Sequence, residues 1–500
     1  MRRVFAGIAL AGVLACLVSP PAAAQGYVLR LDSRVQRAAY RGVLMDSIPL
    51  ASVVTGPGGG PGTPDGFAVR CPSGNAYCFF FRPGPELTAG PLVTSADLTL
   101  WGLGVPGLSV RVNGRVGTDL GDDGWPGLDP AVQLIEGYAE YSRGMLAVRA
   151  GRLLLTQRLG VTGFDGGKVV GRASRWGLEG EVYGGLGLAR ASALPVTSPV
   201  LDPIDAFQPS RRQIVAGGAV AWTGSEGDVR LEYQREVDQD SRNFVSERAA
   251  LSLRLRATQR ISLDAGADYD LANTWFGNAD ATVRYTVPWL TVAAGARQYR
   301  PYFDLWTIWG AFSPVPYHAV NAAAWIRPWS RIEVRGRWER YVYSNTETET
   351  PLVDVDHDGW RAALGVTYTP SSLWSFDVGY REEYGPGASS HGFDGSVTFT
   401  PRPELSLAAY GSTLDRPLEF RFNEASADVI GLDAEWRPVD RIRLGLGAAQ
   451  YWESHDRPDP AAFDWSQTRL NARVTLFFRS QTDFAPLPKA LRRPPPAGGR

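Results

Sequence analysis

Long apolar runs are almost absent from this 500-residue sequence. After the first 25 residues, no stretch reaches the roughly 18 apolar residues that a membrane-spanning helix needs. Mean hydropathy is −0.16 although 44% of the residues are hydrophobic. The apolar residues are therefore dispersed along the chain, and no bundle of membrane-spanning helices is expected. A net charge of −1 likewise gives no reason to expect a nucleic-acid partner.

Cysteine and histidine are also scarce, with three and four residues respectively. Cys71 and Cys78 are too few to build a disulfide-rich domain, but they form a possible disulfide in an oxidising compartment. Two sulfurs without a neighbouring histidine do not make a zinc site. The stretch "CPSGNAYC" lacks the C-x-x-C-H spacing that attaches haem. No cofactor is therefore expected.

The polar residues form no catalytic constellation, so the protein is not expected to be an enzyme. The histidines are scattered over segments that lie on or near one side of the predicted topology: His318, His357, His391 and His455. In "DVDHDG", Asp354, Asp356 and Asp358 are spaced like the first half of a calcium loop. The twelfth position would be Gly365 rather than glutamate, which excludes an EF-hand. A looser calcium site and a solvated acidic loop both stay open.

The N-terminus has the pattern of a secretory signal. "MRR" is followed by the apolar stretch "VFAGIALAGVLACLV" and by "PPAAAQ", which offers a cleavage site after Ala24. A lipid anchor on Cys16 is disfavoured because the downstream site fits better. Residues 1–24 are therefore predicted to be a signal peptide that is cleaved on export.

Apolar residues alternate with polar ones through most of the remaining chain. In "RLNARVTLFFRS" (469–480), every second residue from Leu470 to Phe478 is apolar, and "RIEVRGRWERY" and "RIRLGLGAAQY" repeat the pattern. A period of two predicts β-strands whose successive side chains face opposite sides. Proline-containing short turns near 288, 328, 370, 401 and 438 alternate with longer polar connections. Short turns on one side and long loops on the other are typical of an outer-membrane barrel.

The pattern predicts an all-β, transmembrane, antiparallel up-and-down barrel of about 22 strands (20–24) over residues 25–480. The first predicted strand covers 27–37 and the last 463–479, so that 469–478 would close the barrel against the first strand. Tryptophans near predicted strand ends favour a membrane barrel over a soluble sandwich or propeller. The Pro-rich tail 481–500 is predicted to be disordered in the periplasm. The expected location is the outer membrane, with its lipid as a partner.

One segment resembles a known family. In "AVQLIEGYAEYSRGMLAVRAGRLLLTQRLGVTGFDGGKVVGRA" (131–173), the elements "EGYAEY", "VRAGR" and "FDGGKV" resemble large porin-like barrels of Gram-negative bacteria. With "LRLDSRVQRAAYRG" and "ADLTLWGLG", the resemblance is especially to the porin subunits of porin–cytochrome electron conduits. That resemblance implies a barrel that sheathes a multihaem c-type cytochrome. The glycines of "FDGG" are expected to form a turn or bulge, with a ligand contact as the alternative.

The lumen is expected to be wet and to carry charges of both signs. The residues predicted to line it are Arg111, Arg115, Arg149, Arg254, Arg256, Glu232, Asp264, Asp268, Arg335 and Arg443. A barrel of this size should be partly filled, either by its own loops (43–91, 189–210 and 300–315) or by a partner. The sequence thus predicts a porin-like channel for small solutes, with the cytochrome sheath as the alternative.

Overall fold

The computed structural model describes residues 26–55, 60–121, 128, 131–188, 213–239, 244–300, 316–344, 358–385, 388–415, 425–455 and 464–480. Within these residues, none of the helices has the length and apolar content required to cross a membrane. The predicted signal peptide (1–24) and tail (481–500) lie outside the described residues. Two of the loops that were expected to fill the lumen also lie outside the described residues: 189–210, and 300–315 except for Arg300.

Antiparallel strands form one closed wall. The main sheet joins 24 strands, of which β4 and β5 belong to a separate ribbon, so 22 strands make the barrel. The predicted fold class and strand number are confirmed. The wall strands are β1 (Gly26–Pro49), β6 (Pro91–Trp101), β7 (Leu108–Asp119), β8 (Val132–Arg143), β9 (Leu146–Gln157), β10 (Gly160–Ala173), β11 (Leu178–Gly187), β12 (Gln213–Thr223), β13 (Gly227–Asp238), β14 (Phe244–Arg256), β15 (Ile261–Asp270), β16 (Trp275–Val287), β17 (Leu290–Tyr299), β18 (Tyr317–Trp329), β19 (Ile332–Tyr343), β20 (Asp358–Ser371), β21 (Trp374–Gly385), β22 (Ala388–Arg402), β23 (Leu405–Asp415), β24 (Ala425–Val439), β25 (Ile442–His455) and β26 (Trp465–Arg479).

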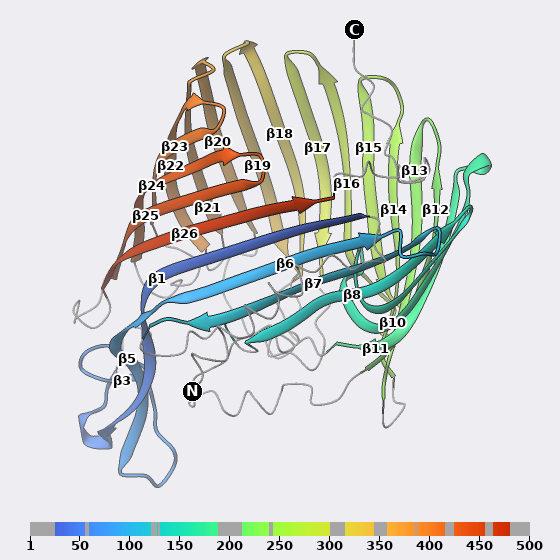
Figure 1. Ribbon diagram of the computed structural model, residues 1–500. Helices are drawn as coiled ribbons and strands as arrows, with labels where there is room; N and C mark the ends of the chain where they lie inside the picture. The colour runs from blue at the N-terminus through green and yellow to red at the C-terminus, as the bar shows by residue number, and fades with distance from the viewer. Residues whose placement is uncertain are drawn as a thin grey trace.

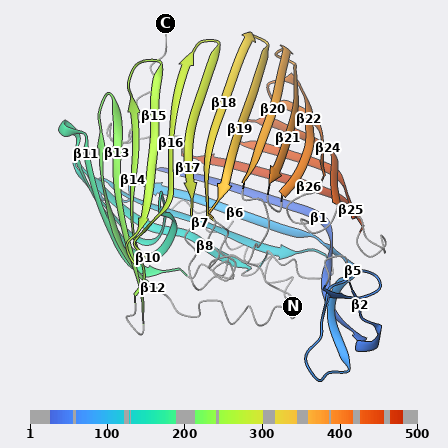
Figure 2. The ribbon, with the colours of Figure 1, turned by 180° about the vertical axis from the view of Figure 1, so that it is seen from behind.

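The first and last strands close the barrel, as the alternation of 469–478 predicts. β1 pairs with β26 from Val28↔Arg479 to Arg37↔Leu470. Across this seam, Arg473 donates to Asp32 at 2.6 Å, and the Thr475 hydroxyl donates to the same carboxylate at 2.9 Å. Closure leaves no open edge in the wall, which a sheet surrounded by lipid requires. Figures 1 and 2 show strongly tilted front strands crossing the steeper strands of the far wall.

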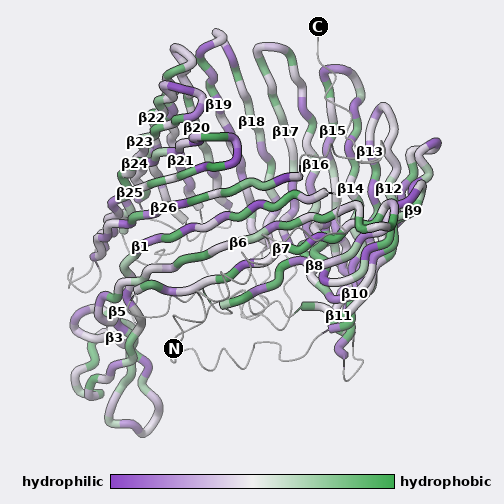
Figure 3. Tube along the Cα trace, in the orientation of Figure 1, coloured by the Kyte–Doolittle hydropathy of each residue, from purple (hydrophilic) through white to green (hydrophobic). Residues whose placement is uncertain are grey.

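The two faces of the wall differ in chemistry because the strands alternate. Large apolar side chains stand exposed on the outer face of most wall strands, among them Val182, Leu231, Val283, Val378, Ile430 and Leu446. The ion pairs between neighbouring strands occupy mainly the other face. Figure 3 shows the resulting alternation of apolar and polar residues along single strands. An apolar exterior around a polar interior is the pattern of a barrel in lipid.

Residues 38–89 depart from the prediction. Beyond Arg37, β1 leaves β26 and pairs with β5 (Tyr77–Ala89), so the two strands form a ribbon that projects beyond the rim (Figure 1). The short strands β2 (Val54–Thr55), β3 (Pro61–Gly62) and β4 (Val69–Arg70) and the 3-10 helix η1 (Leu50–Ser52) complete the ribbon. Phe67, Val69, Cys78 and Phe80 form its small core, and Cys71 is joined to Cys78 by a 2.03 Å S–S bond. The expectation that 43–91 fills the lumen is wrong for its described residues, because that stretch builds its own core outside the barrel.

Candidate functional site

The β9–β10 hairpin leaves the wall and turns into the barrel. β9 pairs with β8 only as far as Gly137↔Arg152, and β10 pairs with β11 only from Phe164↔Gly187 onward. Beyond these limits, the ladder partners of residues 153–163 all belong to β9 and β10, and a two-residue turn at Arg158–Leu159 closes the hairpin. One backbone contact leaves the hairpin, in which the Leu188 N–H donates to the Gly163 carbonyl at 2.8 Å. The hairpin tip is thus a two-stranded ribbon that is not part of the wall sheet. We call residues 153–163 the inward hairpin.

Two paired glycines stand where the inward hairpin bends. Gly151 has a φ of +133°, and a Cβ there would lie 2.3 Å from the carbonyl oxygen of Gly137. A Cβ on its partner Gly166 would lie 2.1 Å from the carbonyl oxygen of Gly184. Only glycine permits this approach of one backbone to the next. "FDGG" therefore serves a bend, and the expected turn or bulge is replaced by a strand that keeps its register with β9 and β11.

Apolar side chains hold the base of the inward hairpin against the inner wall. Leu153, Leu155 and Phe164 are buried with Tyr183 of β11 and Val215 of β12. The rings of Phe164 and Tyr183 stack with their centroids 5.5 Å apart. Phe164 is 0% exposed and Leu153 2%, so this contact is packed like a protein core. The inward hairpin is consequently a fixed part of the lumen.

Polar contacts extend the attachment to three more strands, β13, β14 and β16. The Arg158 backbone N–H donates to Glu232 of β13 at 2.9 Å, and its guanidinium reaches Asp280 of β16 at 2.5 Å. Thr162 donates to Gln234 of β13 at 3.0 Å. Arg248 of β14 donates to the Leu159 carbonyl at 3.0 Å. The tip therefore lies over the inner faces of β13–β16.

The charges beneath the inward hairpin are buried and compensated. Glu181 accepts from Lys168 at 2.7 Å and from Arg230 at 2.6 Å, and Arg230 also donates to Glu232 at 2.7 Å. The Glu181 and Glu232 side chains are each 4% exposed. A buried carboxylate persists only when such partners replace water. These groups serve to anchor the inward hairpin more than to meet a passing solute.

A second cluster of charges and rings follows along β17–β21. Glu339 pairs with Arg297 at 2.6 Å and with Arg361 at 2.5 Å. Arg297 lies over the Tyr317 ring and Arg361 over the Tyr341 ring, with cation–centroid distances of 5.3 and 5.4 Å. Glu383 lies 4.0 Å from Arg361, so two acids face two arginines in this cluster. The inner wall therefore offers fixed dipoles and aromatic faces here, with little net charge.

The structure places the ten predicted lumen residues on the face that carries these networks. Eight of them have a polar partner, through six ion pairs and one backbone contact: Arg111–Asp97 3.1 Å, Arg149–Glu140 2.6 Å, Arg254–Asp264 2.9 Å, Arg335–Asp377 2.7 Å, Arg443–Glu435 3.2 Å, Glu232–Arg230 2.7 Å, and the Asn278 N–H to Asp268 at 2.9 Å. Arg115 and Arg256 share the face by strand alternation. They do not converge on one point but are distributed around the wall. Sequence analysis overlooked Arg158 and Gln234, because nothing in the alternation of β9 and β10 distinguishes them from ordinary wall strands.

The structure does not support a metal site at the candidate aspartates and histidines among the described residues. Asp354, Asp356 and His357 lie outside the described residues, and Asp358 pairs with Arg340 at 2.8 Å. His391 lies 3.0 Å from Asp415 on exposed strand ends. No group of three or more metal-binding side chains occurs in the described part of the chain.

Comparisons with known proteins find likeness in structure only. No protein-family model matches the chain, and none of the curated proteins matches it. The copper transporter OprC aligns with 90% of this chain and 80% of its own length, at 12% identity and a TM-score of 0.46. OccAB2 of Acinetobacter baumannii aligns with 91% of this chain and 98% of its own, at 9% identity and a TM-score of 0.41. The outer membrane protein OprD of Pseudomonas aeruginosa gives 91% and 95%, at 9% identity and a TM-score of 0.39. The fold described above rests on the strand pairing itself.

Proposed function

We propose that the protein is an outer-membrane channel for small polar solutes, in which the inward hairpin narrows the lumen. The observation that carries the proposal is a closed wall with an apolar exterior, a charged interior and a fixed internal constriction. A barrel of this size without an obstruction would leave a wide aqueous hole. The inward hairpin reduces that hole without plugging it through a separate domain.

The lumen should show only moderate ion preference. Its acids and arginines are paired across neighbouring strands, so positive and negative potentials cancel over short distances. Solutes would be sorted mainly by size and by hydrogen bonding to the wall. The solute itself belongs to the class of small, water-soluble molecules.

The cytochrome sheath stays a prediction, and the structure gives it no added support. A sheath needs a lumen wide enough for a folded partner. The inward hairpin occupies part of that space and is held by a buried core. The channel is therefore the function that we favour.

Conductance in planar bilayers tests the proposal. Wild-type protein should form stepwise, ohmic channels, and replacement of residues 154–163 by Gly-Gly should raise single-channel conductance several-fold and admit larger sugars in liposome swelling. A matched variant that shortens the projecting ribbon (residues 72–76) should leave both unchanged. Absence of channels in every variant, or equal conductance with and without the inward hairpin, would contradict the proposal.

A further inference from the structure

The outer face of β23–β26 carries a regular pattern of large and small residues. Following the strand pairing, two neighbouring rows cross these strands and end on β1: Leu407, Ala434, Leu446, Ala472 and Val35 in one, and Ala409, Leu432, Ala448, Leu470 and Arg37 in the other. Leucine and alanine alternate in each row, and the two rows are out of phase. The leucines stand up as ridges, and the alanines leave space between them.

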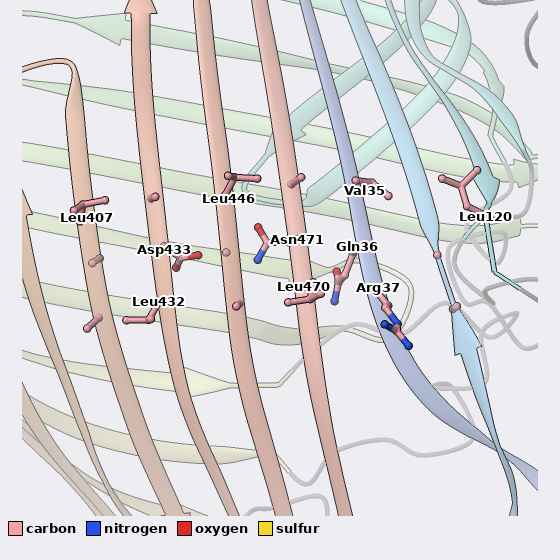
Figure 4. A pocket seen from close by; sticks show the side chains of 18 of the residues that line it. Val35, Gln36, Arg37, Leu120, Leu407, Leu432, Asp433, Leu446, Leu470 and Asn471 are labelled. Carbon is pink, nitrogen blue, oxygen red and sulfur yellow. The ribbon is translucent and has the colours of Figure 1, made fainter.

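This space is a groove of about 980 Å³ on the apolar face of the wall. Figure 4 shows Leu407, Leu432, Leu446 and Leu470 on successive strands, with Arg37 on the adjoining β1. Leu432 is 63% exposed and Leu446 64%, so none of the described residues fills the groove. Where β1 departs into the projecting ribbon, Thr88, Ala89, Gly90 and Leu120 complete the lining. These residues close the groove on one side, whereas an ordinary stretch of barrel surface continues from strand to strand.

A cationic side chain stands at that end. Arg37 is exposed, and within the described residues it makes no ion pair. Arg41 is four residues further along β1 and lies over the Trp465 ring at 4.7 Å, where β26 begins. Both arginines belong to the rim on the long-loop side, at which an outer-leaflet headgroup would lie. An apolar groove that ends at an uncompensated arginine suits a ligand with hydrocarbon chains and an anionic head.

We propose that this groove binds one lipopolysaccharide molecule of the surrounding outer leaflet, with acyl chains between the leucine ridges and a phosphate group on Arg37. The inference rests on the proposed outer-membrane location. Acyl chains gain from filling the alanine gaps by burial and dispersion. The phosphate gains a charge-assisted hydrogen bond where the headgroup region excludes much of the water. Bound lipid would also cover the corner where β1 leaves the wall.

Binding of fluorescent deep-rough lipopolysaccharide to the purified full-length barrel in a neutral detergent tests this site. Arg37→Ala should weaken binding about tenfold, the effect of losing one charge-assisted contact. Ala472→Trp, which fills the groove without changing charge, should weaken it at least as much. Arg340→Ala is the matched control, because Arg340 of β19, like Arg37 of β1, lies near the long-loop rim but is already paired with Asp358. It should bind like wild type, and heat-modifiable gel mobility should show that all four proteins are folded.

Equal affinity of wild type, Arg37→Ala and Ala472→Trp for lipopolysaccharide would overturn the proposal. Equal affinity of the wild-type protein for zwitterionic phosphatidylcholine, which has no net charge, would also overturn it. Dimers that Ala472→Trp disrupts would assign the groove to a second copy of the chain instead, and would also overturn it. Cell fractionation separates this inference from the proposed function. Protein found outside the outer membrane would contradict the location, whereas correct location with no lipid selectivity would contradict only the groove.

Discussion

Two parts of the barrel wall, β11–β16 and β24–β26 with β1, use the same kind of strand in different ways. Along β11–β16 the inner face is covered by the inward hairpin, and its carboxylates are buried among arginines. Along β24–β26 and β1, no described segment covers the inner face. In the ion pair between Arg473 and Asp32, the arginine side chain is 49% exposed and the aspartate side chain 21%. Alternation decides which side a residue faces. The segments that leave the wall decide whether a lumen charge serves structure or meets solvent.

The covered and open parts of the wall should also differ in how much free energy of unfolding is lost when a charged pair is broken. Removing one partner from a buried, compensated pair commonly costs about 3–5 kcal/mol, because the other charge stays buried. An exposed pair contributes about 0–1 kcal/mol. Substitutions of charged residues on the covered part of the wall should therefore lower the free energy of unfolding more than equivalent substitutions on the open part.

The largest effect is expected at the bend. Gly151→Val places a β-branched side chain at a backbone φ of +133°. The Cβ of the new valine would also lie only 2.3 Å from the carbonyl oxygen of Gly137. Strain of about 1–3 kcal/mol per such residue, together with this clash, should release the inward hairpin or prevent assembly. Heat-modifiable mobility and single-channel conductance would detect either outcome. Gly171→Ala in β10 is the control, since its added Cβ meets nothing within 4 Å; equal behaviour of the two variants would contradict the role of Gly151.

Neutralising Glu181 should be the next largest perturbation. Glu181→Gln leaves Lys168 and Arg230 without their shared carboxylate on the covered part of the wall. We expect a loss of about 3 kcal/mol in the free energy of unfolding, measured by urea titration in lipid vesicles. The matched change on the open part of the wall, Glu435→Gln on β24, removes an exposed pair with Arg443 and should cost about 1 kcal/mol or less. Similar losses in both would remove the distinction between the covered and open parts of the wall.

A smaller effect is expected at the seam. Arg473→Ala removes the contact with Asp32 between the last and first strands, which is partly open to water. The expected cost is about 1 kcal/mol, seen as a lower midpoint of the same urea titration. Strand pairing continues over the whole seam, so closure itself should survive. A seam that opens in this variant would show that the ion pair matters more than the backbone ladder.

The smallest effect on the barrel should come from the disulfide. Cys71→Ser with Cys78→Ser acts on a ribbon whose core lies apart from the wall. Proteolysis of the ribbon should become faster, while conductance and barrel stability stay as in wild type. Limited proteolysis followed by mass mapping measures this directly. Altered conductance would mean that the ribbon, like the inward hairpin, shapes the channel.

The strand number and the closing pair β1–β26 could be predicted because alternation is local and persists in every wall strand. The inward hairpin could not, because Leu153, Leu155 and Thr162 alternate as they would in a wall strand. Only Gly151 and Gly166 hint at the bend, and a pair of strand glycines has many uses. The ribbon was missed for another reason. Its aromatic strand "YCFFF" has the composition of a buried segment, and the small core that buries Phe80 depends on tertiary contacts with Phe67 and Val69.

Covalent modification of Leu154→Cys tests the account most directly. Leu154 lies on the face of the inward hairpin opposite the packed Leu155, and it is 38% exposed. A positively charged thiosulfonate reagent should attach there from water and reduce single-channel conductance in steps. Leu231→Cys, on the lipid-facing side of β13, should stay unmodified and conduct as before. Modification of Leu231→Cys with no effect at Leu154→Cys would contradict both the assignment of the faces and the constriction by the inward hairpin.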